Sequence, residues 1–223
     1  MIQVQQGEGA RRVRTVPLRS QLTMQRGIDG STPLHLAASL DWWPGAWLVS
    51  ERFKHIWPWS KTTATLLLRA NICSAYQPDN KGLYPIHIAA LADNPGVTEV
   101  LLQKCPNCAT LRDGKGRTFL HVAAGQWSSL SWRRHLVASY VCRQPKLSSV
   151  LNVQDNNGDT ALHHAVHVGN LVVFNFLVQN PKVDLSIPNK DDLTPLDLSW
   201  SKIPQCLYYQ SVSLDLCLGN FCY

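Results

Sequence analysis

The chain has 223 residues, of which 45% are hydrophobic and 16% are charged, and this composition excludes a wholly disordered protein. A membrane-spanning helix needs about 18 or more consecutive apolar residues. The longest candidate stretch, residues 171–178, is far shorter. The sequence therefore predicts no membrane span in this chain.

Residues 1–26 contain five arginines but only one acidic residue, Glu8, whereas the rest of the chain is nearly neutral. We expect a disordered basic leader here, with a transit peptide or a nucleic-acid-binding tail as the alternative. The segment has no aromatic residue and no clear amphipathic period. Because the basic excess belongs to this tail rather than to a binding face, we expect no nucleic-acid partner.

The seven cysteines show no spacing typical of a disulfide framework, and no signal-peptide pattern occurs at the N-terminus. We therefore expect free thiols in a reducing compartment and a cytoplasmic location.

One phrase of seven residues recurs five times along the chain. Two of the spacings between repeats are 34 residues, and the other two, 52 and 42 residues, indicate insertions in the first and third repeats. The phrase reads TPLHLAA at 32–38, YPIHIAA at 84–90, TFLHVAA at 118–124, TALHHAV at 160–166 and TPLDLSW at 194–200.

The residues of the phrase are typical of the start of a short apolar helix. Thr32 can cap the helix, Pro33 is tolerated at its first position, and His35 can bond the cap or a neighbouring repeat. Upstream of the middle repeats lie turn sequences in which Asp stands five residues, and Gly two residues, before the cap. In the last repeat Asp192 replaces the glycine and Asp197 replaces the histidine.

A second apolar helix is expected after each phrase, so that each unit reads turn, short helix, second helix. The candidate segments are residues 62–68, 97–102, 131–142 and 171–178. Such units bury their apolar sides only against neighbours. The sequence therefore predicts an all-α solenoid of about four repeats plus a partial fifth over residues 27–202, followed by a non-repeat tail at 203–223.

The period and the T-P-L-H-x-A phrase resemble those of the ankyrin-repeat family, whose repeats are about 33 residues long. More narrowly, the tryptophan-rich insertion and the segments 105–124 and 155–166 resemble plant ankyrin proteins of the accelerated-cell-death type. Those proteins pair cytosolic repeats with a C-terminal membrane domain, which is missing here. The resemblance implies a non-enzymatic protein–protein interaction module in plant defence or cell-death signalling. A poorly folded fragment of a larger membrane-anchored protein is an alternative.

We assign eight candidate partner-binding residues, five tryptophans of the first insertion and three cationic residues of the turns. Tryptophan is enriched at interfaces, although these rings can instead pack on the solenoid and bury the insertion. The expected partners are other proteins, including full-length ankyrin relatives that would hold the chain peripherally at the plasma membrane. The residues are Trp42, Trp43, Trp47, Trp57, Trp59, Lys81, Lys115 and Arg117.

Two motifs suggest other chemistry. Cys105 and Cys108 form a CxxC pair, which can be half of a zinc site or a redox pair, so a metal- or redox-responsive protein is the alternative function. The other cysteines are scattered, which favours a structural role. His163, His164 and His167 form an HHxxH cluster without the glutamate of a metalloprotease, and His163 is already the repeat histidine. We therefore assign no catalytic residue, metal ligand or cofactor.

Overall fold

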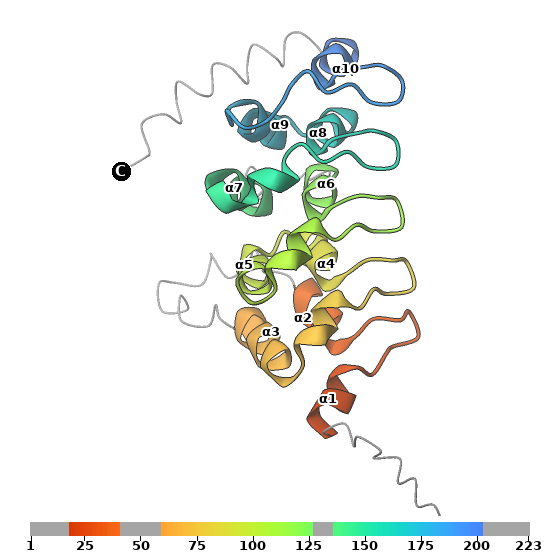
Figure 1. Ribbon diagram of the computed structural model, residues 1–223, viewed down its shortest axis with the longest axis vertical. Coiled ribbons are helices and arrows are strands. Elements are labelled where there is room, and N and C mark those ends of the chain that lie inside the picture. The colour runs from red at the N-terminus through yellow and green to blue at the C-terminus, as the bar shows by residue number, and fades with distance from the viewer. Residues whose placement is uncertain (1–17, 41–58, 127–135, 203–223) are drawn as a thin grey trace, which may run out of the picture.

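The computed structural model describes residues 18–40, 59–126 and 136–202, and all regular secondary structure within these ranges is helical (Figure 1). The prediction of an all-α solenoid is confirmed. None of the described helices combines the length and the apolar character that a membrane span needs.

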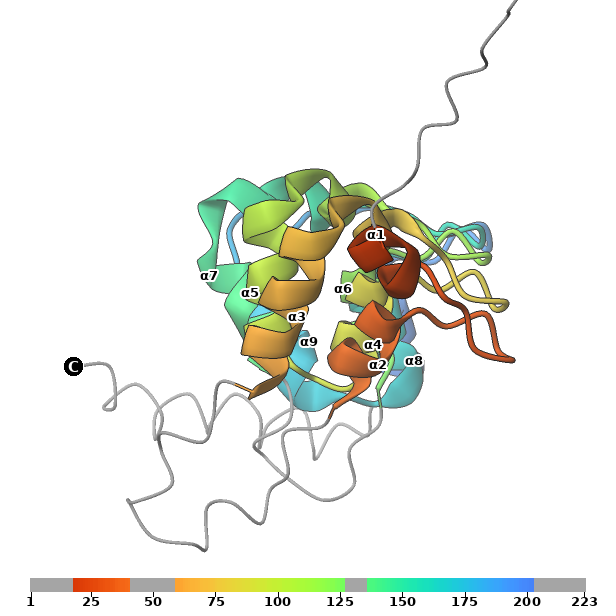
Figure 2. The ribbon, with the colours of Figure 1, turned by 90° about the horizontal axis from the view of Figure 1, so that it is seen from below.

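The helices form two layers, with hairpin loops projecting from the inner layer along one edge of the molecule (Figures 1 and 2). The inner layer consists of α2 (Pro33–Ser39), α4 (Pro85–Leu91), α6 (Phe119–Ala124), α8 (Ala161–Val168) and α10 (Pro195–Lys202). The outer layer consists of α3 (Trp59–Ala70), α5 (Pro95–Lys104), α7 (Leu136–Arg143) and α9 (Leu171–Val178).

Short 3-10 helices lead from an outer helix towards the next hairpin. They are η3 (Ile72–Tyr76), η4 (Pro106–Thr110) and η5 (Pro145–Val150). Two of them begin with proline, which has no N–H to leave unsatisfied at a helix start.

The expected second helices are present. The helix predicted at 171–178 has these bounds in the structure, and those predicted at 62–68 and 97–102 are the middle parts of α3 and α5. The fourth, expected at 131–142, begins at Leu136, since residues 127–135 lie outside the described residues. The insertions of the first and third repeats fall between the inner and outer helices, where residues 41–58 and 127–135 are not described.

The core lies between the two layers and runs through the whole stack. Small side chains let neighbouring inner helices approach closely: Ala38, Ala89, Ala124 and Ala165 are all fully buried. Larger residues such as Phe119 fill the remaining space and are equally buried. Each inner helix packs on the next one, so every repeat buries its apolar surface against its neighbours.

One helix was not expected from the sequence. Helix α1 (Leu18–Thr23) lies inside the segment 1–26 that was predicted to be a disordered leader, and it packs against α3. The side chain of Arg26 then donates to the Gln77 side chain at 2.7 Å and to the Pro78 carbonyl at 3.2 Å. The structure thus describes a helix and contacts with the first two repeats within residues 18–26, the end of the segment expected to be a disordered leader. Residues 1–17 lie outside the described residues, as does the tail at 203–223.

Candidate interaction surface

The hairpin edge (residues 27–31, 79–83, 113–117, 155–159 and 189–193) is built from a turn that recurs with the same hydrogen bonds. In the second repeat, the Asp79 N–H donates to the Leu83 carbonyl at 2.9 Å. The Asp79 carboxylate accepts from the N–H groups of Lys81 and Leu83 at 2.9 and 2.8 Å. Asp113, Asp155 and Asn189 make the equivalent bonds. The short polar side chain thus holds these four turns closed from inside, whereas Gly27 gives the first turn only the backbone bond to the Ser31 carbonyl.

Glycine is required near the end of four of these turns. Gly30, Gly82, Gly116 and Gly158 have φ values of 76°, 76°, 76° and 80°, which residues with a Cβ rarely adopt. In the last repeat Asp192 takes the same left-handed conformation with φ 57°. The predicted turn positions are confirmed.

Three pairs of neighbouring hairpins are joined through their backbones. The Asn80 N–H donates to the Asp29 carbonyl at 3.0 Å, and the Asn156 N–H donates to the Lys115 carbonyl at 3.1 Å. The Lys190 N–H makes the same kind of bond to Asn157 at 3.0 Å. These bonds set the hairpin tips in register along the edge (Figure 2).

The repeat histidines link the same hairpins to the inner helices. Each Nδ1 accepts from the backbone N–H three residues earlier, and each Nε2 reaches a carbonyl of the following hairpin, as expected for a residue that ties repeats. The four pairs are His35 to Leu83 at 2.9 Å, His87 to Arg117 at 3.0 Å, His121 to Asp159 at 3.1 Å and His163 to Leu193 at 3.0 Å.

Both charged and apolar side chains are exposed on this scaffold. Lys81 and Lys115 are exposed at successive hairpin tips. On the adjoining inner helices Leu36 and Leu91 are 59% and 40% exposed. These exposed apolar and cationic side chains are available for contacts with another protein. Leu36 and Leu91 were not among the predicted binding residues. The phrase position of Leu36 indicated a core residue, and Leu91 directly follows the phrase at 84–90.

The structure does not bring all the predicted binding residues together. Arg117 is half-buried, and its guanidinium contacts the Asp113 carboxylate at 2.7 Å, so this side chain braces its own hairpin. Burial favours a raised pKa for Asp113, but its bonds to Arg117 and the turn N–H groups outweigh this and lower the pKa. Trp59 begins α3 in the outer layer, away from the hairpin edge (Figures 1 and 2). Trp42, Trp43, Trp47 and Trp57 lie outside the described residues.

The CxxC pair belongs to the core. Cys105 is the C-cap residue that follows α5 and Cys108 lies in η4, and they are 1% and 0% exposed. Burial raises the pKa of Cys105 and raises that of Cys108 to about 12. Metal binding and thiol exchange both require the thiolate, which these surroundings disfavour. The geometry thus supports the structural role of this motif.

The HHxxH cluster divides into two kinds of histidine. His163 makes the repeat contacts described above, as the sequence indicated. His164 and His167 instead face acidic residues of the hairpin, with His164 Nε2 2.9 Å from Asp155 Oδ2 and His167 Nε2 3.5 Å from Asp159 Oδ2. The sequence pattern alone did not connect these histidines with the two aspartates that precede them in the hairpin.

Hairpin, short helix and second helix stacked through a cap histidine define an ankyrin-repeat solenoid, and residues 148–199 match the family model for ankyrin repeats in many copies. The fold is that of an ankyrin-repeat solenoid, and residues 148–199 are similar in sequence to ankyrin repeats.

Curated relatives match the chain over part of its length. NF-kappa-B inhibitor alpha of Mus musculus is 37% identical over 94 residues, which are 42% of this chain and 29% of the inhibitor. The probable 26S proteasome regulatory subunit p28 of Saccharomyces cerevisiae is 29% identical over 138 residues, 60% of this chain and 58% of the subunit. Alpha-latrotoxin-Lh1a of Latrodectus hasselti is 30% identical over 115 residues, 52% of this chain and 8% of the toxin. The chain thus spans less than two thirds of each of these relatives.

Proposed function

We propose that this protein is a non-enzymatic binding module that recognises another protein with its hairpin edge and the adjoining inner helices. The observation that carries the proposal is the exposure of Lys81, Lys115, Leu36 and Leu91 on a scaffold that is hydrogen-bonded from repeat to repeat. A surface whose backbone is already ordered loses little conformational freedom on binding. Two of the relatives carry names of regulatory proteins, an inhibitor and a proteasome regulatory subunit, which fits a role in binding.

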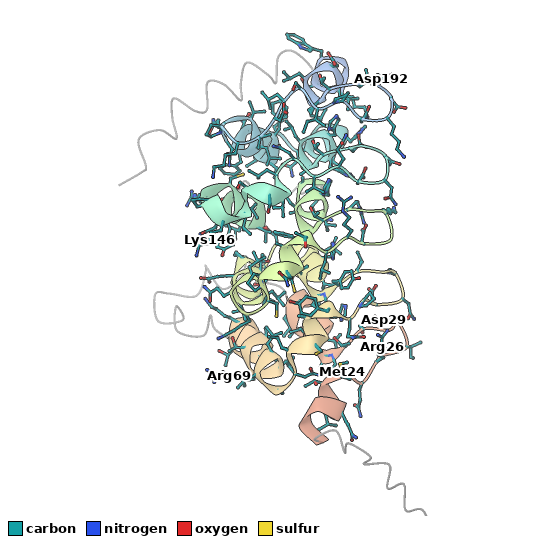
Figure 3. The ribbon with its side chains drawn as sticks, in the orientation of Figure 1. Met24, Arg26, Asp29, Arg69, Lys146 and Asp192 are labelled. Atoms are coloured by element: carbon teal, nitrogen blue, oxygen red, sulfur yellow. The ribbon has the colours of Figure 1, made fainter. Side chains whose placement is uncertain are left out.

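The binding surface is tested with charge reversals on the two edges of the molecule. Arg26, Asp29 and Asp192 lie along the hairpin edge, whereas Arg69 and Lys146 lie on the opposite side (Figure 3). A Lys81→Glu/Lys115→Glu variant should lose at least about tenfold in affinity for a captured partner, about 1.4 kcal/mol. An Arg69→Glu/Lys146→Glu variant carries the same change in net charge and should bind like the unchanged protein. Equal losses in both variants would show that net charge, and not this surface, controls binding.

The narrower proposal places this binding in plant defence or cell-death signalling, with a full-length ankyrin relative as the partner. It is supported by the sequence resemblance of the segments 105–124 and 155–166 to plant ankyrin proteins. Such a partner would hold the protein peripherally at the plasma membrane, and without it the protein would stay in the cytoplasm.

Cell fractionation tests this localisation. The chain is expressed alone and together with a membrane-anchored relative. We expect it in the membrane fraction only in the second case, and there the Lys81→Glu/Lys115→Glu variant should remain in the supernatant. Recovery in the supernatant in both cases would refute the membrane partner but leave binding to other proteins open to the first experiment.

A further inference from the structure

Two buried carboxylates and an imidazole meet at the start of the fourth inner helix. Asp155 and Asp159 come from the hairpin, and His164 comes from α8, which follows it directly. One ligand atom of each residue lies within 4.8 Å of one ligand atom of both others. We call these three residues the Asp–His cluster.

Each carboxylate in the cluster has one oxygen engaged by the fold and one oxygen directed towards a histidine. Asp155 Oδ1 accepts from the N–H groups of Asn157 and Asp159 at 2.8 and 3.0 Å, and its Oδ2 lies beside His164. Asp159 Oδ1 accepts from the Asn189 side chain at 2.9 Å, and its Oδ2 lies towards His167. Hydrogen bonds of this kind orient metal-binding carboxylates in known sites.

Asp155 is the turn residue of its hairpin, but the repeat does not need an aspartate at the place of Asp159 or a histidine at the place of His164. The place of Asp159 is held by Leu83 and Leu193 in the second and fifth repeats, and that of His164 by Ile88 and Val122 in the second and third. These repeats form the same hairpin and helix. A requirement of the repeat therefore explains Asp155, which is 8% exposed, but not the second buried carboxylate, Asp159, which is 6% exposed.

Placing two carboxylates together in a buried position is costly unless a positive charge compensates them. The cluster offers two oxygens and one imidazole nitrogen, the donor types that Zn²⁺ and similar divalent cations accept. The side chain of His164 is 18% exposed, which leaves access from solvent for the ion. In a tetrahedral site with bonds of about 2.0–2.2 Å, neighbouring ligand atoms are about 3.3–3.6 Å apart, so only small side-chain shifts are needed.

We propose that Asp155, Asp159 and His164 bind a divalent cation of the zinc type, with water in the fourth position. The ion would link the fourth hairpin to α8, and its positive charge would compensate the negative charges of the two aspartates. His164 would bind through Nε2 and carry its proton on Nδ1. His167 is not a ligand, because its Nδ1 accepts from the Lys202 ammonium group at 2.7 Å and its Nε2 therefore carries the proton. The site is independent of the proposed partner binding.

The experiment titrates Zn²⁺ into the reduced full chain by calorimetry and repeats the titration with Co²⁺, whose spectrum separates thiolate ligands from oxygen and nitrogen ligands. Two variants introduce residues that other repeats already use. Asp155→Asn copies Asn189, and His164→Val copies Val122. Asp113→Asn is the matched control, because it changes the same turn position in the third repeat, where Arg117 faces the aspartate.

We expect the unchanged protein and Asp113→Asn to bind one Zn²⁺ with a thiolate-free Co²⁺ spectrum, and both cluster variants to lose at least tenfold in affinity. Circular dichroism without metal should be the same for all four proteins. Equal zinc affinity in all four would overturn the proposal, as would a Co²⁺ spectrum showing thiolate ligands alone or the absence of binding by the unchanged protein.

Discussion

The cap histidine determines how one repeat is joined to the next at the scale of single residues. In the third repeat the Thr118 N–H donates to His121 Nδ1, so this nitrogen must offer its lone pair. The proton of the neutral ring is then on Nε2, which donates it to the Asp159 carbonyl of the next hairpin. A protonated ring would direct a second N–H at the Thr118 N–H. The joint between repeats therefore requires the neutral histidine.

The last repeat ends this series through one substitution. Asp197 stands where the histidine would be, and its carboxylate accepts from the Thr194 N–H at 3.0 Å and from the Thr194 hydroxyl at 2.6 Å. The hydrogen bonds from Thr194 lower the pKa of Asp197. An ionised carboxylate has no hydrogen to donate, so it caps α10 without offering a bond to a further hairpin.

Stability should fall as the pH is lowered from about 6.5 towards 4. Burial lowers the pKa of His35, His87 and His163 and brings that of His121 to about 4. Unfolded histidines titrate near 6.5, so in this range the unfolded chain binds protons that the folded chain excludes. The urea midpoint measured at pH 7.5, 6 and 5 should decrease at each step.

The carboxylates do not produce this trend, because Asp113 and Asp155 have lowered pKa values and lose their contribution only at lower pH. A His121→Gln variant is the control and should show a shallower decrease. A midpoint that stays level or rises between pH 7.5 and 5 would exclude the neutral-histidine joint.

The hairpin glycines can be tested by adding a single methyl group. Gly158→Ala should destabilise the protein by about 1–3 kcal/mol, because φ is 80° and the new Cβ would lie 2.8 Å from the Lys190 backbone nitrogen. Gly114→Ala is the control, since its Cβ would meet only the Lys81 carbonyl oxygen at 3.7 Å. Thermal melts should separate the two variants, and similar melting temperatures would contradict the turn geometry.

At the scale of elements, asparagine side chains tie outer helices to the preceding repeat. Asn94 caps α5 by accepting from the Val97 N–H at 3.1 Å, and its amide donates to the Leu40 carbonyl at 3.1 Å. Asn170 does the same at α9, accepting from Val173 and donating to the Gln126 carbonyl at 3.0 Å. The side chain that begins an outer helix thus also fixes where that helix lies.

The packing of α5 and η4 predicts how the cysteines react. Cys73 is exposed, whereas Cys105 and Cys108 are buried with raised pKa values. In the folded protein an alkylating reagent should modify Cys73 at least about tenfold faster than the CxxC pair, because reaction needs an accessible thiolate. Peptide mass spectrometry after timed labelling measures the rates. Rapid labelling of Cys108 under native conditions would contradict its burial and would favour a redox-responsive role of the CxxC pair.

At the scale of the whole molecule, stability depends on contacts between neighbouring repeats. Helix α6 packs between α4 and α8 in the inner layer, whereas α10 packs on α8 from one side among the described residues. A change in the middle of the stack therefore disturbs two interfaces, and a change in α10 disturbs one.

We expect Leu120→Ala in α6 to cost about 2–5 kcal/mol, because this fully buried side chain leaves a cavity in the middle of the stack. Leu198→Ala in α10, where the leucine is 5% exposed, should cost less and loosen mainly the last repeat. Urea unfolding gives the global loss, and amide hydrogen exchange locates it. The expectation fails if Leu198→Ala raises exchange evenly through all the repeats.

The sequence by itself determined the repeat, its turns and its helices. The Asp and Gly positions of the hairpins, the cap histidines and the apolar residues of the helices act within a few residues of one another, so their spacing predicts their geometry. The α9 bounds follow from the apolar run at 171–178, and the role of each histidine in tying repeats follows from its place beside the cap. Asp192 replaces the glycine of the other turns, but it takes the same left-handed backbone conformation, and the hairpin at 189–193 has the same hydrogen bonds as the others.

Only the tertiary structure decided which polar and sulfur groups lie at the surface and which meet inside. It buried Cys105 and Cys108, paired Arg117 with Asp113, placed α1 on α3 and left Leu36 and Leu91 exposed. It also brought His164 to Asp155, nine residues away, and Asn189 to Asp159, thirty residues away. Such contacts depend on how the hairpins stack and on the direction in which each helix presents its side chains. The spacing of repeats along the sequence specifies neither of these.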